Sequence, residues 1–201
     1  MNDIKCIIFD WGGVLIDNPT ESFNNECAKR IGISVEQLEN AYSDFSSQFE
    51  RGRLKESDLW KNIGKRLNIN IKNNHSIWKE CFMKIYSPRN EIFNLAKQLK
   101  KNGYVIALLS NTEIPAMNFF EEQNYEMFDY KVFSCKEGTA KPEPELYKIL
   151  LDKMKISGQQ SLFIDDKIEN LTTANELQMN TIHYKNHEDL IKNLHKHSIT
   201  I

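Results

Sequence analysis

Short hydrophobic runs rich in β-branched residues recur along this chain and alternate with segments of helical periodicity. The runs are IKCIIF (4–9), YVIALLS (104–110), KVFSC (131–135), SLFI (161–164) and TIHY (181–184). Nearly continuous hydrophobic runs are typical of strands that are buried on both faces of a sheet. The alternation therefore predicts an α/β fold, a parallel sheet with helices on both faces.

Two segments in the second half of the chain show the clearest helical periodicity. Between Glu91 and Asn102, hydrophobic residues recur at positions 92, 95, 96 and 99, and Gly103 follows where a glycine commonly ends a helix. A second helix is predicted from Glu143 to Met154, with prolines at its start. These helices fit the connections between successive parallel strands.

The stretch from Asp17 to Ser87 contains several helical patterns and no convincing strand. Ser34 and Gln37 have the spacing of a capping box ahead of one helix, and Ser57 is expected to cap another. We therefore predict a core formed by residues 1–16 and 88–201. A small α-helical cap, residues 17–87, is inserted after the first strand and lies over the carboxyl edge of the sheet.

Composition and charge limit the classes of partner. The 201 residues are 40% hydrophobic and 27% charged, and the net charge is −2. Such a balance gives no reason to expect nucleic acid or a membrane as a partner. No hydrophobic run approaches the roughly 20 residues of a membrane-spanning helix, and the N-terminus lacks a signal-peptide pattern. We expect a cytoplasmic protein, and the pattern does not specify an oligomeric state.

The four cysteines do not indicate a disulfide framework or a metal site, because no pair has CxxC spacing. Cys6 and Cys135 fall in the predicted strands, where a free cysteine acts as a small buried hydrophobic residue. The chemistry of this protein is therefore expected to come from other side chains.

Polar residues stand where three of the predicted strands end. They are Asp10 after the first strand, Ser110, Asn111 and Thr112 at the end of the second, and Asp165 and Asp166 after the fourth. The carboxyl ends of parallel strands meet at one edge of the sheet, where ligands bind in open α/β folds. Lys141, just ahead of a predicted helix, is expected at the same edge. Taken singly, each residue is typical of a turn, a helix cap or the surface, but their joint placement indicates a site.

Clustered carboxylates repel one another and need a cation or a proton. A set of oxygen ligands without histidine or cysteine favours Mg²⁺, which usually keeps coordination positions for a phosphate oxygen. Lys141 would neutralise that phosphate and Ser110 would donate to it. Asp10 is a candidate nucleophile that would form an aspartyl-phosphate, and the Gly12-Gly13 turn would let the backbone approach the phosphate.

Four segments that carry these residues resemble, in order, the four motifs of the haloacid dehalogenase-like hydrolase superfamily. They are IIFDWGGVL with Asp10, LLSN with Ser110, AKPEPELY with Lys141, and FIDDKIENLTTANELQMNTI with Asp165, Asp166 and Asn170. The segment FERGRLKESDLW also resembles the cap of the subgroup that contains glucose-1-phosphate phosphatase. The resemblance covers nearly the whole chain.

The resemblance implies a Rossmann-like core with a helical cap, and phosphoryl transfer through Asp10 from a small phosphorylated substrate such as a sugar phosphate. It implies that Asp10, the backbone carbonyl of Gly12 and Asp166 hold Mg²⁺, with Asp165 as a further ligand or as a support of the ligands. Catalysis would use Asp10 and Lys141. Substrate binding would use Ser110, Asn111 and Lys141.

One position departs from the pattern of the superfamily. Most of its phosphatases have a second aspartate two residues after the nucleophile, and here that position is Gly12. General acid–base help is worth about 10²–10⁴ in rate. We therefore hypothesise a slow or selective phosphatase that favours good leaving groups. Asp17 lies nearby in sequence as a candidate substitute for the missing acid.

Two alternatives remain open. One is a catalytically weak or inert regulatory or binding protein, and the other is a metal-independent 2-haloacid dehalogenase, which needs no acid at the Gly12 position. Arg51, Arg53, Trp11 and Trp60 are further candidates to face the site. Their default interpretation is a solvated arginine or a core aromatic residue.

Overall fold

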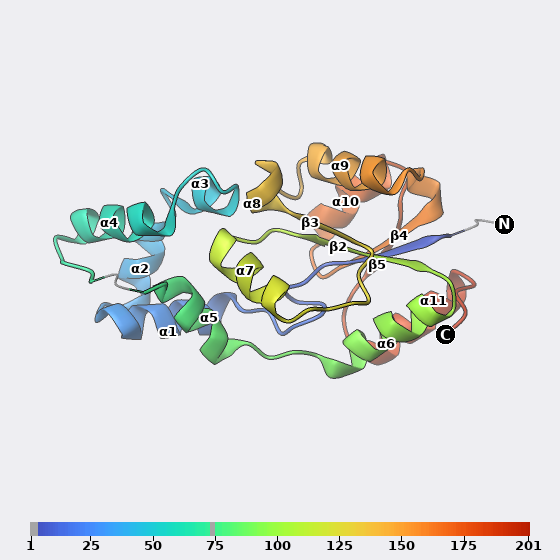
Figure 1. Ribbon diagram of the computed structural model, residues 1–201, viewed down its shortest axis with the longest axis horizontal. Helices are drawn as coiled ribbons and strands as arrows, with labels where there is room; N and C mark the ends of the chain where they lie inside the picture. Colours follow the sequence, from blue (N-terminus) through green and yellow to red (C-terminus); the bar gives the residue numbers. More distant parts are fainter. Residues whose placement is uncertain (1–3, 73–74) are drawn as a thin grey trace.

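Five parallel strands form one sheet in the order β3-β2-β1-β4-β5 (Figure 1). The description rests on a computed structural model and covers residues 4–72 and 75–201. The strands are β1 (Cys6–Phe9), β2 (Val105–Ser110), β3 (Tyr130–Phe133), β4 (Ser161–Asp165) and β5 (Asn180–His183). The prediction of a parallel α/β sheet from the five hydrophobic runs is confirmed.

The register aligns the carboxyl ends of the three central strands. Phe9, the last residue of β1, lies opposite Leu108 of β2 and Ile164 of β4. The amide of Asp10 then donates to the carbonyl of Ile164 at 2.9 Å. Residues that follow β1 therefore emerge beside the last residues of β2 and β4, as parallel pairing requires.

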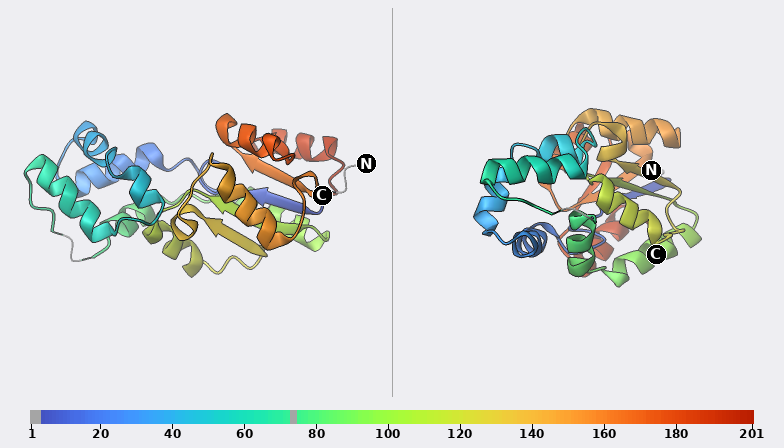
Figure 2. Two further views of the ribbon diagram at one scale, coloured as in Figure 1. Left: turned by 90° about the horizontal axis from the view of Figure 1, so that it is seen from above. Right: turned by 60° about the vertical axis from the view of Figure 1, so that its left-hand side comes forward.

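Helices cover both faces of the sheet, giving a Rossmann-like arrangement of layers (Figures 1 and 2). They are α6 (Asn90–Lys101), α7 (Ile114–Glu122), α8 (Ser134–Glu137), α9 (Pro144–Met154), α10 (Ile168–Glu176) and α11 (His187–Lys196). The side chains of successive residues in β1 point to opposite faces of the sheet. Ile7 and Phe9 pack in the cluster that includes residues of α6, α7 and α11, and Cys6 and Ile8 in the cluster with α9 and α10.

Among the described residues, five further helices lie between β1 and α6 in the chain and extend beyond the carboxyl ends of the strands (Figures 1 and 2). They are α1 (Thr20–Ile31), α2 (Val35–Tyr42), α3 (Ser46–Glu50), α4 (Glu56–Leu67) and α5 (Ile77–Ile85), and we call them the helical segment. The chain enters the helical segment near Asp17 and leaves it near Ser87, and these two connections lie side by side. The amide of Asp17 donates to the carbonyl of Ser87 at 3.0 Å, and that of Arg89 to Leu15 at 2.9 Å.

The capping box predicted at Ser34 and Gln37 is confirmed, since each side chain accepts from the other residue's backbone amide. The cap predicted at Ser57 is wrong, because α4 begins at Glu56 after an extended Lys55. The Glu56 carboxylate accepts from the Trp60 indole in the same helix and from Ser76 and Trp78 at the start of α5, which fixes this helix end by tertiary contacts.

Cys135 was expected in a strand and lies instead in the short helix α8, since β3 ends at Phe133. All four cysteines are free and buried. Trp11 and Trp60 are 3% and 1% exposed, which confirms that both are core residues.

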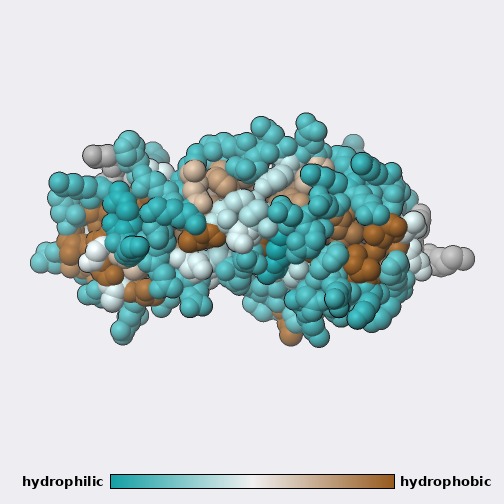
Figure 3. All heavy atoms as spheres, turned by 90° about the horizontal axis from the view of Figure 1, so that it is seen from below, coloured by the Kyte–Doolittle hydropathy of each residue, from teal (hydrophilic) through white to brown (hydrophobic). Residues whose placement is uncertain are grey.

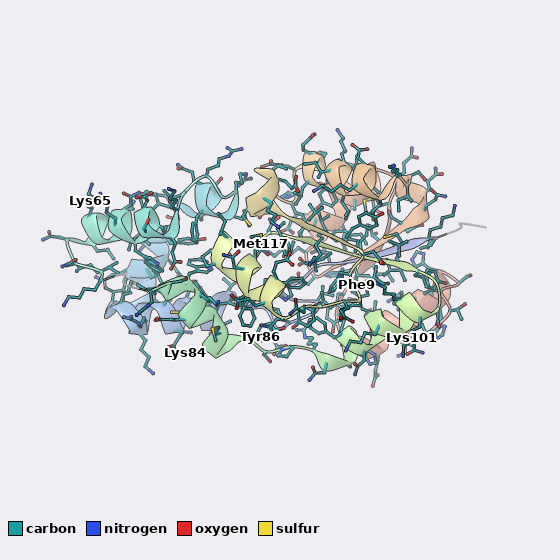
Figure 4. All side chains as sticks on the ribbon, in the orientation of Figure 1. Phe9, Lys65, Lys84, Tyr86, Lys101 and Met117 are labelled. Atoms are coloured by element: carbon teal, nitrogen blue, oxygen red, sulfur yellow. The ribbon has the colours of Figure 1, made fainter. Side chains whose placement is uncertain are left out.

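Most charged side chains lie on the surface of the protein. Lys65, Lys84 and Lys101 point outward from three different helices, whereas Phe9 lies within the sheet (Figure 4). The face drawn in Figure 3 is mostly hydrophilic, with hydrophobic residues exposed in separate places. Among the described residues, no helix has the length and hydrophobicity needed to cross a membrane.

Candidate active site

A buried ion-pair triad lies at the carboxyl edge of the sheet. The Nζ atom of Lys141 is 2.7 Å from Oδ1 of Asp10 and 2.7 Å from Oδ2 of Asp165. Their side chains are 2%, 9% and 0% exposed, respectively. Asp10 follows β1 and Asp165 ends β4, while Lys141 comes from the loop ahead of α9. The structure thus brings together three residues that the sequence predicted at this edge.

The triad perturbs the ionisation of its members. Burial raises the pKa of Asp10 to about 7; the charge of Lys141 opposes this rise and that of Asp165 adds to it. Burial disfavours the charge on Lys141, but the two carboxylates outweigh it and hold the pKa of the ammonium above its usual value. Without a further cation, one lysine therefore does not fully compensate two buried carboxylates.

Both oxygens of Asp165 already accept hydrogen bonds. Asn170 Nδ2 lies 3.0 Å from each of them, and the backbone amide of Lys167 donates to Oδ1 at 2.8 Å. With the Lys141 contact at Oδ2, this carboxylate is held from several sides. Asp165 therefore orients Lys141 and has little hydrogen-bonding capacity left over.

Asp166 has the opposite environment. Its Oδ1 atom is buried and has no hydrogen-bond partner, and burial, followed by the charge of Asp165, raises its pKa. The backbone of Gly13 passes so close that a Cβ atom there would lie 2.3 Å from Asp166 Oδ2. Gly13 also has a φ of +90°, which glycine adopts readily. An orphaned buried carboxylate oxygen calls for a proton or a cation.

A metal ion can satisfy Asp10 and Asp166, and Asp165 lies close enough to support them or to coordinate as well. One oxygen each from Asp10, Asp165 and Asp166 lies within 4.8 Å of the others. A set of hard oxygen ligands without nitrogen or sulfur suits Mg²⁺. The site thus fits a divalent cation in three respects. Its ligands are carboxylate oxygens, one oxygen of Asp166 has no partner, and Lys141 alone does not balance the negative charge.

Asn111 and Ser110 have different surroundings. The Asn111 side chain donates to the carbonyl of Lys141 at 2.8 Å and accepts from its amide at 2.7 Å, which fixes the backbone of that lysine. The hydroxyl of Ser110 lies 2.6 Å from that of Thr112. Ser110 is buried and does not contribute to the lining of the adjacent cavity, whereas Asn111 does.

A cavity of about 240 Å³ opens beside the triad. Asp10, Gly12, Asn111 and Lys141 line it from the edge of the sheet, and Glu50 from the helical segment. We call it the polar cavity. Gly12 contributes no side chain, and a Cβ atom there would lie 3.3 Å from Cδ of Pro19.

Sequence reasoning missed three acids that line the polar cavity, the partly buried Glu50 and Glu113 and the exposed Glu169. Burial, together with the charge of Glu50, raises the pKa of Glu113 to about 7, and burial also raises the pKa of Glu50. Glu113 stands three residues after Ser110, so its position beyond the second strand was a usable signal. Glu50 reaches the site from α3, and no local pattern marks it.

Three other candidates are engaged elsewhere. Asp17 accepts from Ser87 Oγ at 2.7 Å and from Arg89 Nε at 3.0 Å. The Ser87 hydrogen bond, followed by the Arg89 contacts, lowers its pKa, so it does not suit the role of the missing acid. Arg51 pairs with Glu143, and Arg53 donates to the carbonyl of Gly138 at 2.7 Å. Neither arginine lines the polar cavity; both tie the helical segment to the loop ahead of α9.

The fold and site define a parallel α/β protein with a carboxylate–lysine centre at the carboxyl edge of its sheet. The family model of the haloacid dehalogenase-like hydrolases matches residues 4–177. The chain belongs to this family of hydrolases, and the family resemblance read from the four segments is confirmed.

Known proteins similar to this chain include phosphatases. It is 28% identical over 182 residues to the sesquiterpene phosphatase astK of Aspergillus oryzae, covering 89% of each chain. It is 24% identical to the D-ribitol-5-phosphate phosphatase of Bacteroides thetaiotaomicron, with 92% of this chain and 94% of the relative covered. Among solved structures, a HAD family enzyme of B. thetaiotaomicron, in complex with magnesium and inorganic phosphate, has a TM-score of 0.79 at 24% identity. That alignment covers 90% of this chain and 94% of the other.

Proposed function

We propose that the protein is a Mg²⁺-dependent phosphatase that hydrolyses a small phosphate monoester through Asp10. The observation that carries this proposal is the buried triad of Asp10, Lys141 and Asp165 beside the unpartnered oxygen of Asp166. A nucleophilic carboxylate, an ammonium and room for a divalent cation are the groups that phosphoryl transfer needs. The two phosphatase relatives and the solved structure with magnesium and phosphate support the same conclusion.

Asp10, Asp166 and the backbone carbonyl of Gly12 would hold the metal ion, and Asp165 would support them or coordinate as well. When bound, Mg²⁺ supplies positive charge that neutralises the phosphate and lowers the pKa of the carboxylates. Since Asp165 already accepts several hydrogen bonds, its main contribution is to orient Lys141.

Catalysis proceeds in two displacements at phosphorus. An oxygen of Asp10 forms a bond to phosphorus while the bond from phosphorus to the ester oxygen breaks, and the electron pair stays on that oxygen. Gly12 offers no acid, so the departing oxygen takes its proton from solvent or from another group in the polar cavity. Water then attacks the phosphorus of the aspartyl-phosphate and releases inorganic phosphate and the Asp10 carboxylate. Lys141 compensates the negative charge in both steps.

We further propose that residues 17–87 act as a cap over the core formed by residues 1–16 and 88–201. In support, the Ser134 hydroxyl donates to the carbonyl of Glu50 at 2.8 Å, and Glu50 lines the polar cavity. Closure of such a cap would exclude water from the site during phosphoryl transfer.

The test is phosphate release from acetyl phosphate and p-nitrophenyl phosphate by the wild type, Asp10→Asn and the control Asp152→Asn, whose side chain is exposed on α9. We expect Mg²⁺-dependent release by the wild type and by the control, and a loss of at least about 10³-fold in Asp10→Asn. No release by any of the three would contradict the proposal and favour a regulatory protein. EDTA-insensitive release of chloride from 2-chloropropionate would instead favour a dehalogenase.

A further inference from the structure

A second cavity adjoins the polar cavity within the helical segment. Its volume is about 330 Å³, compared with about 240 Å³ for the polar cavity. Four residues line both cavities, namely Pro19, Thr20, Glu50 and Glu113. A molecule whose phosphate lies beside Asp10 therefore has this second space directly next to it.

Four aromatic rings contribute to the walls of the second cavity, which we call the aromatic cavity. Phe23, Tyr42, Trp78 and Phe82 all line it. The ring centroids of Phe23 and Trp78 are 4.2 Å apart, and those of Tyr42 and Trp78 are 5.5 Å apart. Packed rings form a preformed hydrophobic surface that loses little conformational entropy when a ligand binds.

Among the described residues, the walls of the aromatic cavity offer no positively charged side chain. The residues that line the aromatic cavity include no lysine or arginine, so it offers no counter-ion to a second phosphate. Its two acids, Glu50 and Glu113, both have a raised pKa because they are buried, which favours their neutral forms. The faces of the four rings offer sugar hydroxyls no conventional hydrogen-bond acceptor, whereas an aromatic or hydrocarbon group packs against them without that cost.

Polar side chains also line this cavity, and the protein itself already engages several of them. The Tyr42 hydroxyl donates to Glu113 at 3.4 Å, the Asn24 amide to Glu39 at 2.9 Å and the Ser46 hydroxyl to the carbonyl of Ser43 at 3.1 Å. These groups have less hydrogen-bonding capacity left for a ligand. The walls thus suit a largely hydrophobic group.

We propose that the aromatic cavity binds the organic part of the substrate, and that this part is an aromatic or largely hydrocarbon group. The inference rests on the proposed phosphatase function and narrows the substrate from phosphate monoesters in general to esters of hydrophobic alcohols. The phosphate occupies the polar cavity beside Asp10 and Lys141, and the hydrophobic group extends past Glu113 to Trp78.

The test compares two esters of primary alcohols, so that the leaving groups are chemically alike. They are 2-(2-naphthyl)ethyl phosphate and glycerol 3-phosphate, and acetyl phosphate reports phosphoryl transfer without a large organic part. We expect kcat/KM for the naphthyl ester to exceed that for glycerol 3-phosphate by at least about tenfold. Each buried methylene group stabilises the bound transition state, and the naphthyl group buries many more carbon atoms than glycerol.

Ser46→Phe places a ring in the aromatic cavity from the first residue of α3. Gln48→Phe is the matched control, since Gln48 is exposed on the same helix and does not line this cavity. In Ser46→Phe, we expect the ratio of kcat/KM for the naphthyl ester to that for acetyl phosphate to fall by about tenfold or more. In Gln48→Phe, this ratio should stay at the wild-type value.

Binding of 2-(2-naphthyl)ethanol, measured by calorimetry, separates this inference from the proposed function. We expect the alcohol to bind the wild type and Gln48→Phe, and to bind Ser46→Phe about tenfold more weakly. If acetyl phosphate is hydrolysed but the naphthyl ester is no better than glycerol 3-phosphate, the substrate class is wrong and the phosphatase stands. If no ester releases phosphate, the proposed function fails, and absence of alcohol binding would overturn the role of the cavity as well.

Discussion

Replacing Lys141 by methionine tests the buried triad most directly. Methionine fills similar space but carries no charge, so Asp10 and Asp165 lose their shared counter-ion, which now lies 2.7 Å from each. Asp165 keeps its hydrogen bonds from Asn170 and from the Lys167 amide. Asp10 is therefore the carboxylate that the substitution leaves least compensated.

The expected loss of stability follows from burial. At an effective dielectric constant of about 20, each ion pair at 2.7 Å has a gross attraction of about 6 kcal/mol, most of which desolvation offsets. Removing one partner of a buried pair leaves an uncompensated charge and costs about 3–5 kcal/mol. We expect Lys141→Met to lower the free energy of unfolding by about this amount at pH 8 without metal.

The loss should depend on pH with a definite sign. The pKa of Asp10 is about 7 in the folded protein and about 3.9 in an unfolded chain. The folded state thus binds this proton more tightly, and Asp10 reduces stability progressively as the pH rises from about 4 to 7. Since the charge of Lys141 lowers that pKa, its removal raises the pKa further. The difference between variant and wild type should therefore be larger at pH 8 than at pH 5.

Urea unfolding followed by circular dichroism, in EDTA, measures this difference at both pH values. Lys148→Met serves as the control, because Lys148 is exposed on α9, and it should change stability by less than about 0.5 kcal/mol. Adding Mg²⁺ should restore part of the loss in Lys141→Met by replacing the missing positive charge. A loss below about 1 kcal/mol, or an equal loss at pH 5 and pH 8, would refute this account of the triad.

Two further substitutions test local features of the chain. Gly13→Ala would bring a Cβ atom to 2.3 Å from Asp166 Oδ2 at a φ of +90°. We expect the free energy of unfolding in urea to fall by about 1–3 kcal/mol. Phosphate release should be at least about tenfold slower. Gly32→Ala has a φ of +77° but no atom within 4 Å of the new Cβ; it should lose stability without losing activity, and equal activity losses would contradict the role of Gly13. Ser34→Ala removes the capping box with Gln37 and should cost about 1 kcal/mol in the same unfolding assay, whereas unchanged stability would show that the cap contributes nothing.

The sequence by itself determined the parallel sheet and the edge of it at which the polar site residues lie. Five hydrophobic runs are long enough and continuous enough to be strands, and parallel pairing places Asp10, Asp165 and Asp166 at one edge of the sheet. That the first and fourth strands are adjacent, which makes these acids neighbours, came from the structure. The capping box at Ser34 and Gln37 was also readable, because it depends on residues three apart.

Only the tertiary structure decided how each polar group is used. Asp165 is saturated with hydrogen bonds whereas Asp166 keeps an unpartnered oxygen, although the two residues are adjacent in sequence. Asp17 is bound to Arg89, and Glu50 reaches the polar cavity from the helical segment. These outcomes depend on contacts between residues far apart in the chain. Hydrophobic periodicity reports only which face of an element is buried, and it carries no record of which distant side chain meets it there.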